Sequence, residues 1–402
     1  MNLTENNVVA YFQPILSADS NDVYAFEVLG RYIDENGKVC SLGPFFNNPD
    51  ISHEDALRVD RIVRRYAMKK YAEEKRTEYL FINIRLAWLL PFVDNPEDMK
   101  TLQLAKEFGI PNERLVIEIT EEDFNASEEY LRAIVHYKRA GCRIALDDYG
   151  KEASNIDRLA KLQPDIIKIN IDYIHNSETS YHYREYLHAI ASFADSVGIE
   201  ILYEGVETER QLDICISSKG RFYQGFLLAI PQPSMIEPDV NKFVFSALIA
   251  TAYSAIQTKV TEAESLKDYI DILIERFFRE NPFSYEKIIN NEYLIKLFGE
   301  LSEVIRIYLC NRKGVQLSNN IERQEDNIVC REFKNKNWAW RGYFHEIIKA
   351  FIRGRKSCLT NPYRDFTTKE KICTYCYAIN DDAFLLADII KKPDRINYNV
   401  SG

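Results

Sequence analysis

The chain has 402 residues, of which 46% are hydrophobic and 28% charged, and a formal net charge of -10. This length exceeds the usual size of one domain and predicts at least two. The acidic balance argues against a protein that binds along a nucleic-acid polymer, because such proteins carry clustered Lys and Arg. A small phosphate ligand is still compatible with it, since divalent cations can supply positive charge locally.

The N-terminus, MNLTENNVVAYFQPI, has no basic region followed by an apolar region, so no secretory signal is predicted. No run of about 18 apolar residues is present, which predicts no membrane-spanning helix. The weakly polar stretch from 243 to 256 is interrupted by Ser and Thr and has an amphipathic pattern. We therefore expect a cytoplasmic protein with reduced cysteines.

The cysteine pair Cys373 and Cys376 forms a CxxC motif within KICTYCYAI, which alternates like a strand. Side chains three residues apart on a strand point to opposite faces. No second CxxC or paired histidine accompanies them, so the pattern favours a structural role over a metal or redox role.

Residues 1–235 alternate short apolar strands with amphipathic helices, and the helical patterns at 128–141 and 183–198 lead into glycines suited to a C-cap. Repeated β-α units predict a parallel sheet with helices outside it. This many strands in so short a segment favour a closed (β/α) barrel over an open sheet. The predicted strands are 23–29, 79–84, 114–120, 143–148, 165–170, 200–205 and 221–226.

From about 238 to 280, apolar residues recur at steps of three or four, which predicts a long helical connector with one apolar stripe. After residue 284 the composition is strand-rich and aromatic, through VIRIYLCNRKGVQL, NWAWRGYF and KICTYCYAINDDAFLLADI. Two or three strands with helices between them predict a small α+β domain. The predicted domains are a barrel over 1–238, a connector over 239–284 and a C-terminal domain over 285–402. The stripe consists of Phe245, Ile249, Ala252, Ile256, Val260, Ala263, Leu266, Ile270, Leu273 and Phe277.

Polar residues fall at or just beyond the ends of the predicted barrel strands. Side chains at the carboxyl ends of barrel strands converge on the catalytic face, and several acids there would repel each other without cations. Oxygen ligands without His or Cys suit Mg²⁺ or Mn²⁺, and adjacent Asp147 and Asp148 could bridge two ions as in two-metal phosphoester hydrolases. Lys168 could hold the attacking water or the leaving oxygen. The strand-end residues are Glu27, Asn83, Glu118, Asp147, Asp148, Lys168, Glu204, Glu207 and Gln224.

Within FEVLGRY, Glu27-Val28-Leu29 stands where the EAL motif of cyclic-di-GMP phosphodiesterases lies, with Val in place of the central Ala. The chain therefore resembles the EAL-domain family. This resemblance implies a modified (β/α)8 barrel that binds cyclic-di-GMP and, when competent, cleaves one phosphodiester to give linear pGpG. The other matching motifs, in the family's order, are YFQPI (11–15), FINI (81–84), EITE (118–121), DDYG (147–150), KLQPDIIKI (161–169), YEGVE (203–207) and QGFLLAIP (224–231).

The resemblance also implies roles for individual residues. Lys168 would order the attacking water, Glu121 would support the loop after Asp147, and Arg31 would face a ligand phosphate. Glu204, Glu207 and Gln224 would line the metal-water and ligand network, with Glu204 and Glu207 in the catalytic set. The implied metal ligands, for Mg²⁺ or Mn²⁺, are Glu27, Asn83, Glu118 and Asp147 for one ion, with Asp148 completing the second site. The implied ligand-binding residues are Gln13, Glu27, Leu29, Arg31, Asn83, Asp148, Lys168, Glu207 and Gln224.

Two departures from the family pattern bear on activity. The loop after the aspartates reads GKEASNI (150–156) instead of a sequence close to GTGYSSL, and Asn170 stands where active members have Asp. Loss of that carboxylate predicts weaker binding of the second cation. The chain is then either a phosphodiesterase with slow or regulated turnover or a catalytically silent receptor that signals to a partner. A nucleic-acid phosphodiesterase of another kind is disfavoured by the charge and the motif order.

The segments GKEASNIDR (150–158) and NWAWRGYF (337–344) narrow the resemblance to a YkuI-like subgroup, in which a PAS- or Cache-like sensor domain follows the EAL domain. Aromatic residues around Arg341 could form a pocket for a carboxylate-bearing or planar ligand. Alternatively, Trp338 and Trp340 are core or dimer-interface residues and Arg341 pairs with Asp381 or Asp382. Family members commonly dimerise through the barrel, so we expect a homodimer whose C-terminal domain binds a small molecule or a protein partner.

Overall fold

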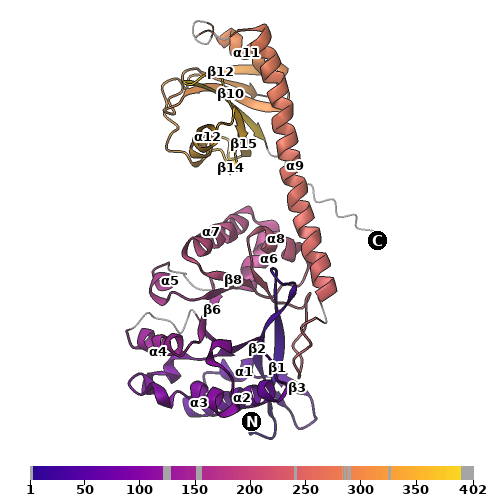
Figure 1. The fold of residues 1–402 in the computed structure, drawn as a ribbon, viewed down its shortest axis with the longest axis vertical. Helices are drawn as coiled ribbons and strands as arrows, with labels where there is room; N and C mark the ends of the chain where they lie inside the picture. Colours follow the sequence, from indigo (N-terminus) through magenta and orange to yellow (C-terminus); the bar gives the residue numbers. More distant parts are fainter. Residues whose placement is uncertain are drawn as a thin grey trace. The chain divides into compact units, whose positions relative to one another are not determined.

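The computed structural model describes residues 3–120, 128–150, 156–239, 242–282, 284, 287, 291–324 and 327–390. It divides into two compact units, Met1–Ile256 and Gln257–Gly402 (Figure 1).

The first unit is built on a closed barrel. Its strands neighbour one another in the order β1, β9, β8, β7, β6, β5, β4 and β2, and the pairing of β1 with β2 closes the ring. All these neighbours are parallel except β1, which runs antiparallel to both β2 and β9. The strands are β1 Val8–Ser17, β2 Asp22–Ile33, β4 Tyr79–Asn83, β5 Leu115–Thr120, β6 Arg143–Tyr149, β7 Ile166–Ile169, β8 Glu200–Tyr203 and β9 Phe222–Tyr223, with β3 Val39–Ser41 attached to β2. The barrel and its seven predicted strands are confirmed, and β1, which contains the YFQPI motif, is an eighth.

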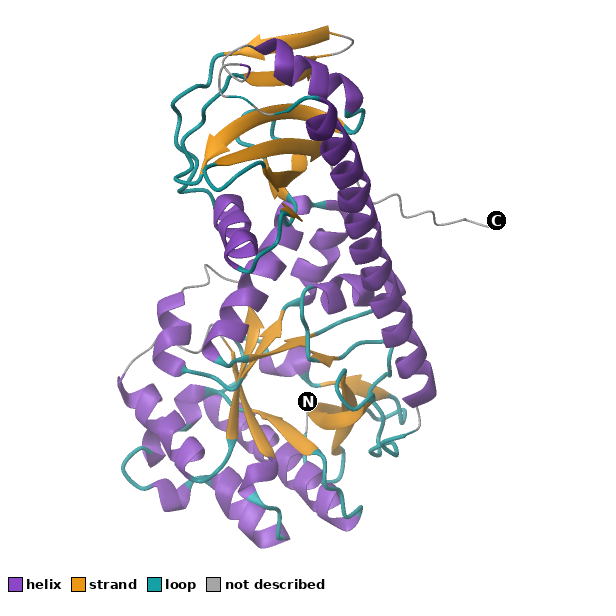
Figure 2. Cartoon of the chain, turned by 45° about the horizontal axis from the view of Figure 1, so that its top comes forward, coloured by secondary structure: helices purple, strands orange, loops and turns teal. Residues whose placement is uncertain are grey.

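Helices surround these strands (Figure 2). The predicted helical segments are present as α4 Glu128–Arg139 and α7 Tyr181–Val197. The α7 helix ends, as expected, at Gly198, which adopts a left-handed conformation with φ 76° that glycine accepts without strain. The remaining helices of this unit are α1 Gly43–Phe46, α2 His53–Glu73, α3 Lys100–Phe108, α5 Ile156–Leu162, α6 Ile171–Thr179 and α8 Glu209–Ser217, with short 3-10 turns at Leu86–Trp88, Leu90–Phe92, Pro96–Asp98 and Asn112–Arg114.

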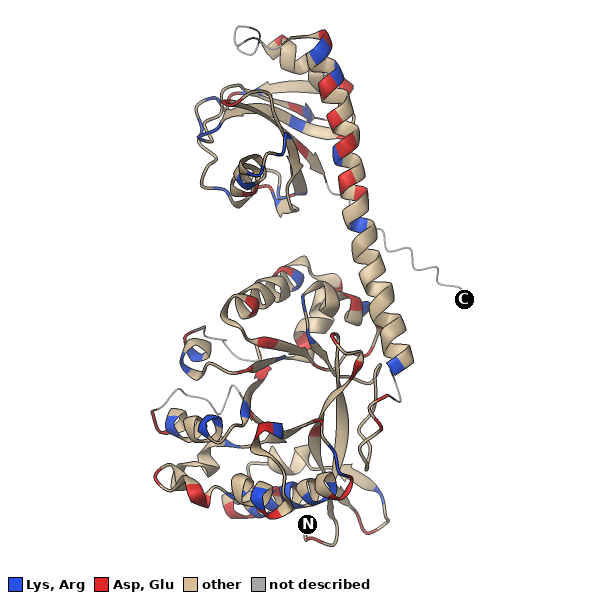
Figure 3. Cartoon of the chain, viewed as in Figure 1, with Lys and Arg blue, Asp and Glu red and all other residues tan. Residues whose placement is uncertain are grey.

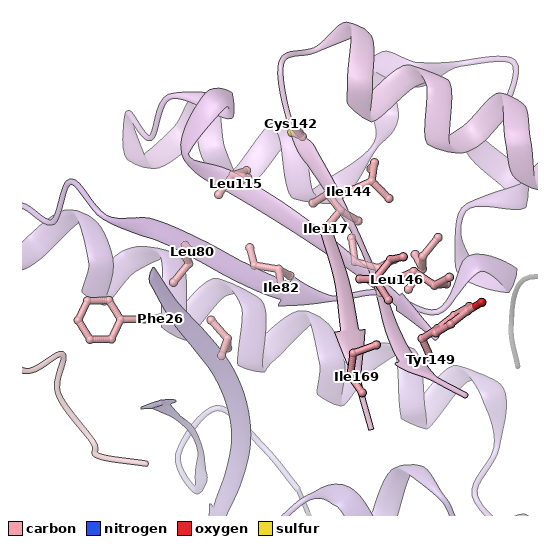
Figure 4. Close-up of a cluster of buried hydrophobic side chains, with 14 of the residues drawn as sticks. Phe26, Leu80, Ile82, Leu115, Ile117, Cys142, Ile144, Leu146, Tyr149 and Ile169 are labelled. Carbon is pink, nitrogen blue, oxygen red and sulfur yellow. The ribbon is translucent and has the colours of Figure 1, made fainter. Parts of the chain in front are cut away.

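Side chains alternate between the two faces of each barrel strand. One set belongs to the core cluster shared with the helices, and Ile82, Ile117 and Leu146 illustrate it in Figure 4. The other set fills the interior of the barrel with a separate apolar cluster. Its buried members are Ile15, Ala25, Phe81, Val116, Ala145, Ile166, Leu202 and Phe222. The barrel is therefore packed inside, and this cluster forms a floor beneath the polar residues described below.

The second unit contains an antiparallel sheet with helices on both faces. Its strands lie in the order β12, β11, β10, β16, β15 and β13, and β14 also pairs with β15. The C-terminal half of α9 (Lys242–Glu280) and α11 (Asn291–Glu300) pack on one face through Ile274, Phe277 and Leu297, whereas α12 (Gly342–Ile352) packs on the other. The strands are β10 Val304–Asn311, β11 Asn320–Gln324, β12 Asn327–Arg331, β13 Ser357–Leu359, β14 Tyr363–Arg364, β15 Lys371–Ala378 and β16 Ala383–Ile390.

One expectation about this unit was wrong in detail. The sheet has more strands than the two or three predicted, because the edge strands are short and some, such as β12, are largely exposed. The aromatic segment 337–344 leads into the first turn of α12. The expectation that the two cysteines point to opposite faces of a strand is confirmed. Cys376 lies in the cluster that contacts α12, and Cys373 is on the other face of β15.

The long helix α9 contributes to both cores. Its N-terminal part places Phe245 and Ile249 in the core of the first unit, and its C-terminal part places Ile270 and Ile274 in that of the second. By length and composition alone it contains a stretch apolar enough to cross a membrane, of which 17% is buried. Core helices pass the same test, so this property assigns no location. Figure 3 shows acidic and basic residues along its C-terminal half and few along its N-terminal half.

Candidate active site at the carboxyl ends of the barrel strands

A layer of polar residues follows the apolar floor of the barrel. Each of its members lies two residues further toward the carboxyl end of its strand than a floor residue, as Glu118 follows Val116 and Lys168 follows Ile166. On the antiparallel strand β1 the direction reverses, so Gln13 precedes Ile15. Because side chains repeat every second residue, these positions share the inner face with the floor. The layer comprises Gln13, Glu27, Asn83, Glu118, Asp147, Lys168, Glu204 and Gln224, all of which were predicted from the sequence as site residues.

Lys168 is the centre of this layer. Its side chain is 1% exposed, and its ammonium contacts carboxylates from four different strands or strand ends. The distances from Lys168 Nζ are 2.5 Å to Glu118 Oε1, 2.5 Å to Glu204 Oε1, 3.1 Å to Asp147 Oδ1 and 3.5 Å to Glu27 Oε1. One ammonium therefore faces four carboxylates, which leaves three negative charges when all of them are ionised.

Burial and this charge imbalance change the proton affinities of the site. Burial raises the pKa of the Glu118 carboxyl well above its usual value, and the nearby Glu27 carboxylate adds to the rise. Burial also raises the pKa of Asp147 and of Glu204. For Lys168, burial by itself would lower the pKa, but the surrounding carboxylates outweigh it and raise the pKa well above its usual value. The lysine therefore remains an ammonium, while the carboxylates favour additional positive charge, from protons or from metal ions.

Two amide side chains fix the orientation of the carboxylates. Asn83, directly beside Glu118 in the parallel pairing of β4 and β5, donates from Nδ2 to Glu118 Oε2 over 2.9 Å and to Glu27 Oε1 over 3.4 Å. Gln224 donates from Nε2 to Glu27 Oε2 over 2.7 Å. These hydrogen bonds connect strands that are far apart in the sequence, so the carboxylates are held in place by their neighbours.

The paired aspartates lie at the end of β6. Asp148 has a φ of 55°, and its backbone N–H donates to Asp147 Oδ1 over 2.9 Å. The left-handed conformation is tolerated by Asp, and it falls at an irregularity in the pairing of β6 with β7, between Leu146 and Tyr149. Asn170, at the N-cap of α6, donates from Nδ2 to Asp148 Oδ1 over 2.7 Å. Asp147 thus forms an ion pair with Lys168, whereas Asp148 accepts a hydrogen bond from Asn170.

The donor set fits a hard divalent cation. The four implied ligands of one ion, Glu27, Asn83, Glu118 and Asp147, supply oxygen atoms, the donors that Mg²⁺ and Mn²⁺ prefer. Glu118 Oε1 is buried and has no hydrogen bond within the described part of the chain, although it forms the ion pair with Lys168. In the same described ranges, no three Asp, Glu, His or Cys side chains form a ready metal cluster. A cation would enter this layer by displacing the ammonium from some of its carboxylates.

Other predicted residues lie outside this contact network. Arg31 donates from Nη1 to the carbonyl oxygen of Gly30 over 2.9 Å, and its guanidinium lies 5.8 Å from the centre of the Tyr11 ring. The Glu207 side chain is 46% exposed, and its carboxylate lies 3.8 Å from His175 Nε2. Leu29 is half-buried on β2. Glu121 lies outside the described residues.

Two residues that neighbour predicted site residues were missed by the sequence reasoning. Asn170 was treated only as the loss of a carboxylate, yet its amide binds Asp148 directly. His175 was passed over because it does not end a strand, although it lies in α6, immediately after β7, next to Glu207. The sequence could have indicated His175, because it lies about one turn into the helix that follows β7, the strand that carries Lys168.

Comparison with known proteins agrees with this geometry. The EAL domain model matches residues 1–231, and the model of the EAL-domain associated signalling protein domain matches residues 239–392. The EAL-domain containing protein YkuI of Bacillus subtilis (strain 168) is 32% identical over 394 residues, which cover 96% of this chain and 94% of YkuI. The crystal structure of YkuI in complex with cyclic-di-GMP and calcium superimposes with a TM-score of 0.86 at 30% identity, covering 97% of this chain and 98% of that one.

A second relative matches the barrel. The cyclic di-GMP phosphodiesterase RocR of Pseudomonas aeruginosa is 26% identical over 232 residues, which cover 56% of this chain and 57% of RocR. The chain belongs to the EAL-domain family and, with its C-terminal signalling domain, to the YkuI-like proteins within it.

Proposed function

We propose that the barrel binds cyclic-di-GMP at the carboxyl ends of its strands and hydrolyses one of its phosphodiester bonds to give pGpG, in a reaction that depends on Mg²⁺ or Mn²⁺. The observation that carries this proposal is the contact of the buried Lys168 ammonium with four carboxylates. The relatives support it, because YkuI was solved with cyclic-di-GMP and calcium and RocR is a cyclic di-GMP phosphodiesterase.

We assign different roles in the reaction to different residues of the polar layer. A bound divalent cation would neutralise charge on the phosphate oxygens and lower the pKa of a water molecule. Glu27, Asn83, Glu118 and Asp147 would provide its ligands. Lys168 stays protonated, so it can donate hydrogen bonds that orient the attacking water but cannot accept the proton of that water. Glu204, whose pKa is raised and which contacts Lys168, would accept the proton.

One observation favours a second function, a receptor that binds cyclic-di-GMP without cleaving it. Asn170 occupies one oxygen of Asp148 with a hydrogen bond of 2.7 Å and adds no negative charge of its own. A second cation beside Asp148 would have to compete with the Asn170 amide for the Asp148 oxygen. It would also have one carboxylate fewer near it than in active members of the family, which have Asp at this position. Binding through the first cation would persist, while turnover would be slow.

An assay with the full-length protein tests these functions. Cyclic-di-GMP binding is measured by calorimetry with Ca²⁺, and conversion to pGpG is followed by chromatography with Mn²⁺ or Mg²⁺. Metal-dependent formation of pGpG supports the phosphodiesterase, and binding without conversion supports the receptor. Absence of binding with every cation would refute both.

The Glu118→Gln variant connects the assay to the site. It keeps the shape of the side chain but removes a charge from the layer, so pGpG formation should fall at least a hundredfold. Glu113→Gln is the matched control, because Glu113 is exposed at the other end of β5. Equal activity of the two variants would show that the reaction takes place elsewhere.

The remaining assignments are also proposals supported by resemblance: a cytoplasmic homodimer, domain boundaries at 238 and 284, and ligand contacts from Gln13, Leu29, Arg31 and Glu207. Light scattering of the purified chain with and without cyclic-di-GMP tests the oligomeric state. A monomer under both conditions would rule out the homodimer.

A further inference from the structure

The start of helix α12 carries a buried arginine surrounded by aromatic rings. Arg341 is the N-cap residue of α12, and it is 9% exposed. Its guanidinium lies within cation–π distance of four rings. The distances from Arg341 Cζ to the ring centres are 4.0 Å for Phe366, 5.2 Å for Tyr363, 5.5 Å for Trp340 and 5.5 Å for Tyr343.

This guanidinium lacks an acidic partner. Among the residues that the structure describes, no carboxylate or carbonyl oxygen accepts a hydrogen bond from the Arg341 side chain, and the anticipated pairing with Asp381 or Asp382 is not formed. A guanidinium has five N–H donors. No Arg341 nitrogen is among the buried atoms that lack a hydrogen-bond partner in the described residues, so these donors reach solvent, where a ligand can accept from them. The surrounding rings provide no planar acceptor for the donors.

The position on the helix also favours an anion. The N-terminus of α12 carries the positive end of the helix dipole, its first turn has no acidic residue, and Arg341 gives no side-chain cap. A cation at that end is unfavourable, whereas an anion would be stabilised by both the guanidinium and the free backbone N–H groups. The buried guanidinium and the uncapped helix end therefore favour the same kind of occupant.

A further cation lies at the edge of this cluster. The ammonium of Lys369 lies 5.9 Å from the centre of the Phe366 ring, whose other neighbour is the Arg341 guanidinium. Two cations next to one ring repel each other, and an anion that reaches both relieves the repulsion. Arg341 and Lys369 thus place two positive charges beside this ring.

The acidic groups on the neighbouring strands are already engaged. Asp388 accepts from Thr374 Oγ1 over 2.7 Å and pairs with Arg306 over 3.1 Å. Asp365 also pairs with Arg306, over 3.1 Å, and accepts from the backbone N–H of Thr368 over 2.9 Å. These contacts keep both carboxylates with Arg306, so neither neutralises Arg341.

The rim of the cluster is apolar and open to solvent. Trp340 and Phe366 are 64% and 60% exposed, and their rings stack with centres 5.8 Å apart. Phe366 lies in a turn held by Asp365, which fixes its position next to Arg341. Beneath the rim, the Tyr343 and Tyr363 rings stack 4.8 Å apart. Flat apolar walls beside a cationic centre suit a planar organic group that carries an anionic end.

We propose that the second unit binds a small planar organic carboxylate here, with its carboxylate on the Arg341 guanidinium and the α12 N-terminus and its planar part against Trp340 and Phe366. Guanidinium matches the two oxygens of a carboxylate with two parallel hydrogen bonds. Inorganic phosphate shares the negative charge but gains nothing from the aromatic rim. The proposal concerns the second unit only and is independent of the phosphodiester chemistry of the barrel.

Benzoate is the probe that matches this chemistry, and benzamide is its neutral counterpart of the same shape. Binding to the full-length protein is measured by calorimetry and by the tryptophan fluorescence that Trp340 contributes, at constant ionic strength. We expect saturable binding of benzoate and at least tenfold weaker binding of benzamide and of inorganic phosphate. Phosphate binding as tightly as benzoate would refute the planar carboxylate. Absence of saturable benzoate binding would refute the site.

Substitution locates the site. Arg341→Gln should weaken benzoate binding at least tenfold, whereas Arg353→Gln, at the exposed C-terminal end of the same helix, should change it less than twofold. Circular dichroism melting checks that both variants fold. If Arg341→Gln does not fold, Arg341→Lys keeps the charge but loses the paired hydrogen bonds, and a threefold to tenfold loss is expected. Unchanged affinity in the folded Arg341 variant would place the ligand elsewhere and overturn the proposal.

Discussion

Asn170 donates a hydrogen bond of 2.7 Å from its side-chain amide to Asp148, the second of the two adjacent aspartates. The carbonyl oxygen of the same amide accepts from the backbone N–H of Asp172 over 2.9 Å and caps α6. An Asp at position 170 could keep the cap, because carboxylates are equally good N-cap acceptors. It could not donate to Asp148 and would place a second negative charge beside it. The Asn170 amide thus forms hydrogen bonds with both Asp148 and the Asp172 N–H without a metal ion. A carboxylate at this position would accept from the Asp172 N–H but repel Asp148.

The Asn170→Asp variant is therefore expected to be less stable without metal and to respond more strongly to it. Loss of the hydrogen bond and the new repulsion should cost about 1–3 kcal/mol of unfolding free energy. Mn²⁺ should recover most of this loss by binding between the two carboxylates, and pGpG formation should rise. Urea unfolding with Mn²⁺ and with EDTA measures the effect. Asn170→Ser, which retains a cap acceptor without adding charge, is the control, and an equal metal response in both variants would contradict the interpretation.

Lys168→Met should remove the single cation from the carboxylate layer. Breaking a buried ion pair by deleting one partner typically costs about 3–5 kcal/mol, because the other charge remains buried. Addition of Mn²⁺ should restore part of the stability, since a cation can take the place of the ammonium, while pGpG formation stays abolished. Lys161→Met is a suitable control, because the pair of Lys161 with Asp157 is exposed and contributes at most about 1 kcal/mol. A loss of stability in Lys168→Met that Mn²⁺ leaves unchanged would argue against a metal site in this layer.

Gly225, next to Gln224 in the polar layer, permits a close approach of two backbone segments. A Cβ atom at this position would lie 2.1 Å from the carbonyl oxygen of Val206, which is shorter than any real contact. Gly225→Ala should therefore displace this segment together with Gln224, and lower the unfolding free energy by more than about 2 kcal/mol. Gly43→Ala is the control, because its nearest neighbour would be 3.4 Å away. Similar melting temperatures of the two variants would contradict the predicted clash.

The inner residues of the polar layer could be predicted because their positions follow from the strand period alone. Once Val116 and Ile166 are assigned to the interior, Glu118 and Lys168 must share that face two residues later. The rule does not extend past the strands. Glu207 lies in the loop after β8, where the two-residue repeat of a strand no longer determines the direction of a side chain. Its carboxylate faces His175 instead of Lys168.

Features that depend on tertiary contacts could not be predicted in the same way. The antiparallel place of β1 between β2 and β9 follows from closure of the ring. The bond from Asn170 to Asp148 joins the helix after one strand to the turn after another, and residue types alone do not specify it. In the second unit, β13 and β14 are short and acquire their strand conformation from pairing with β15.

In the core of the second unit, Arg306 is shared by three carboxylates. It lies 3.1 Å from Asp388, 3.1 Å from Asp365 and 3.2 Å from Glu322. Burial raises the pKa of Asp388 to about 6, although Arg306 and the hydrogen bond from Thr374 oppose the rise. The pKa of Asp365 is lowered, because its hydrogen bonds with Arg306 and Thr368 outweigh its burial. One guanidinium therefore keeps Asp365 ionised but leaves Asp388 partly protonated near neutral pH.

Because Asp388 loses its proton as the pH rises, the second unit should become less stable. Its pKa of about 6 in the folded protein exceeds its ordinary value of 3.8, so between these values the folded state holds a proton that the unfolded state has lost. The associated stability is complete below pH 4 and is lost above pH 6, by an amount on the order of 3 kcal/mol. Asp388→Asn, which cannot ionise, should remove this dependence, whereas Asp381→Asn, at an exposed position, should keep it. Hydrogen exchange of peptides from β10, β15 and β16, corrected for the intrinsic effect of pH, measures the stability of this sheet directly. The same slope in the Asp388→Asn variant would mean that another group, such as Glu322, takes up the proton.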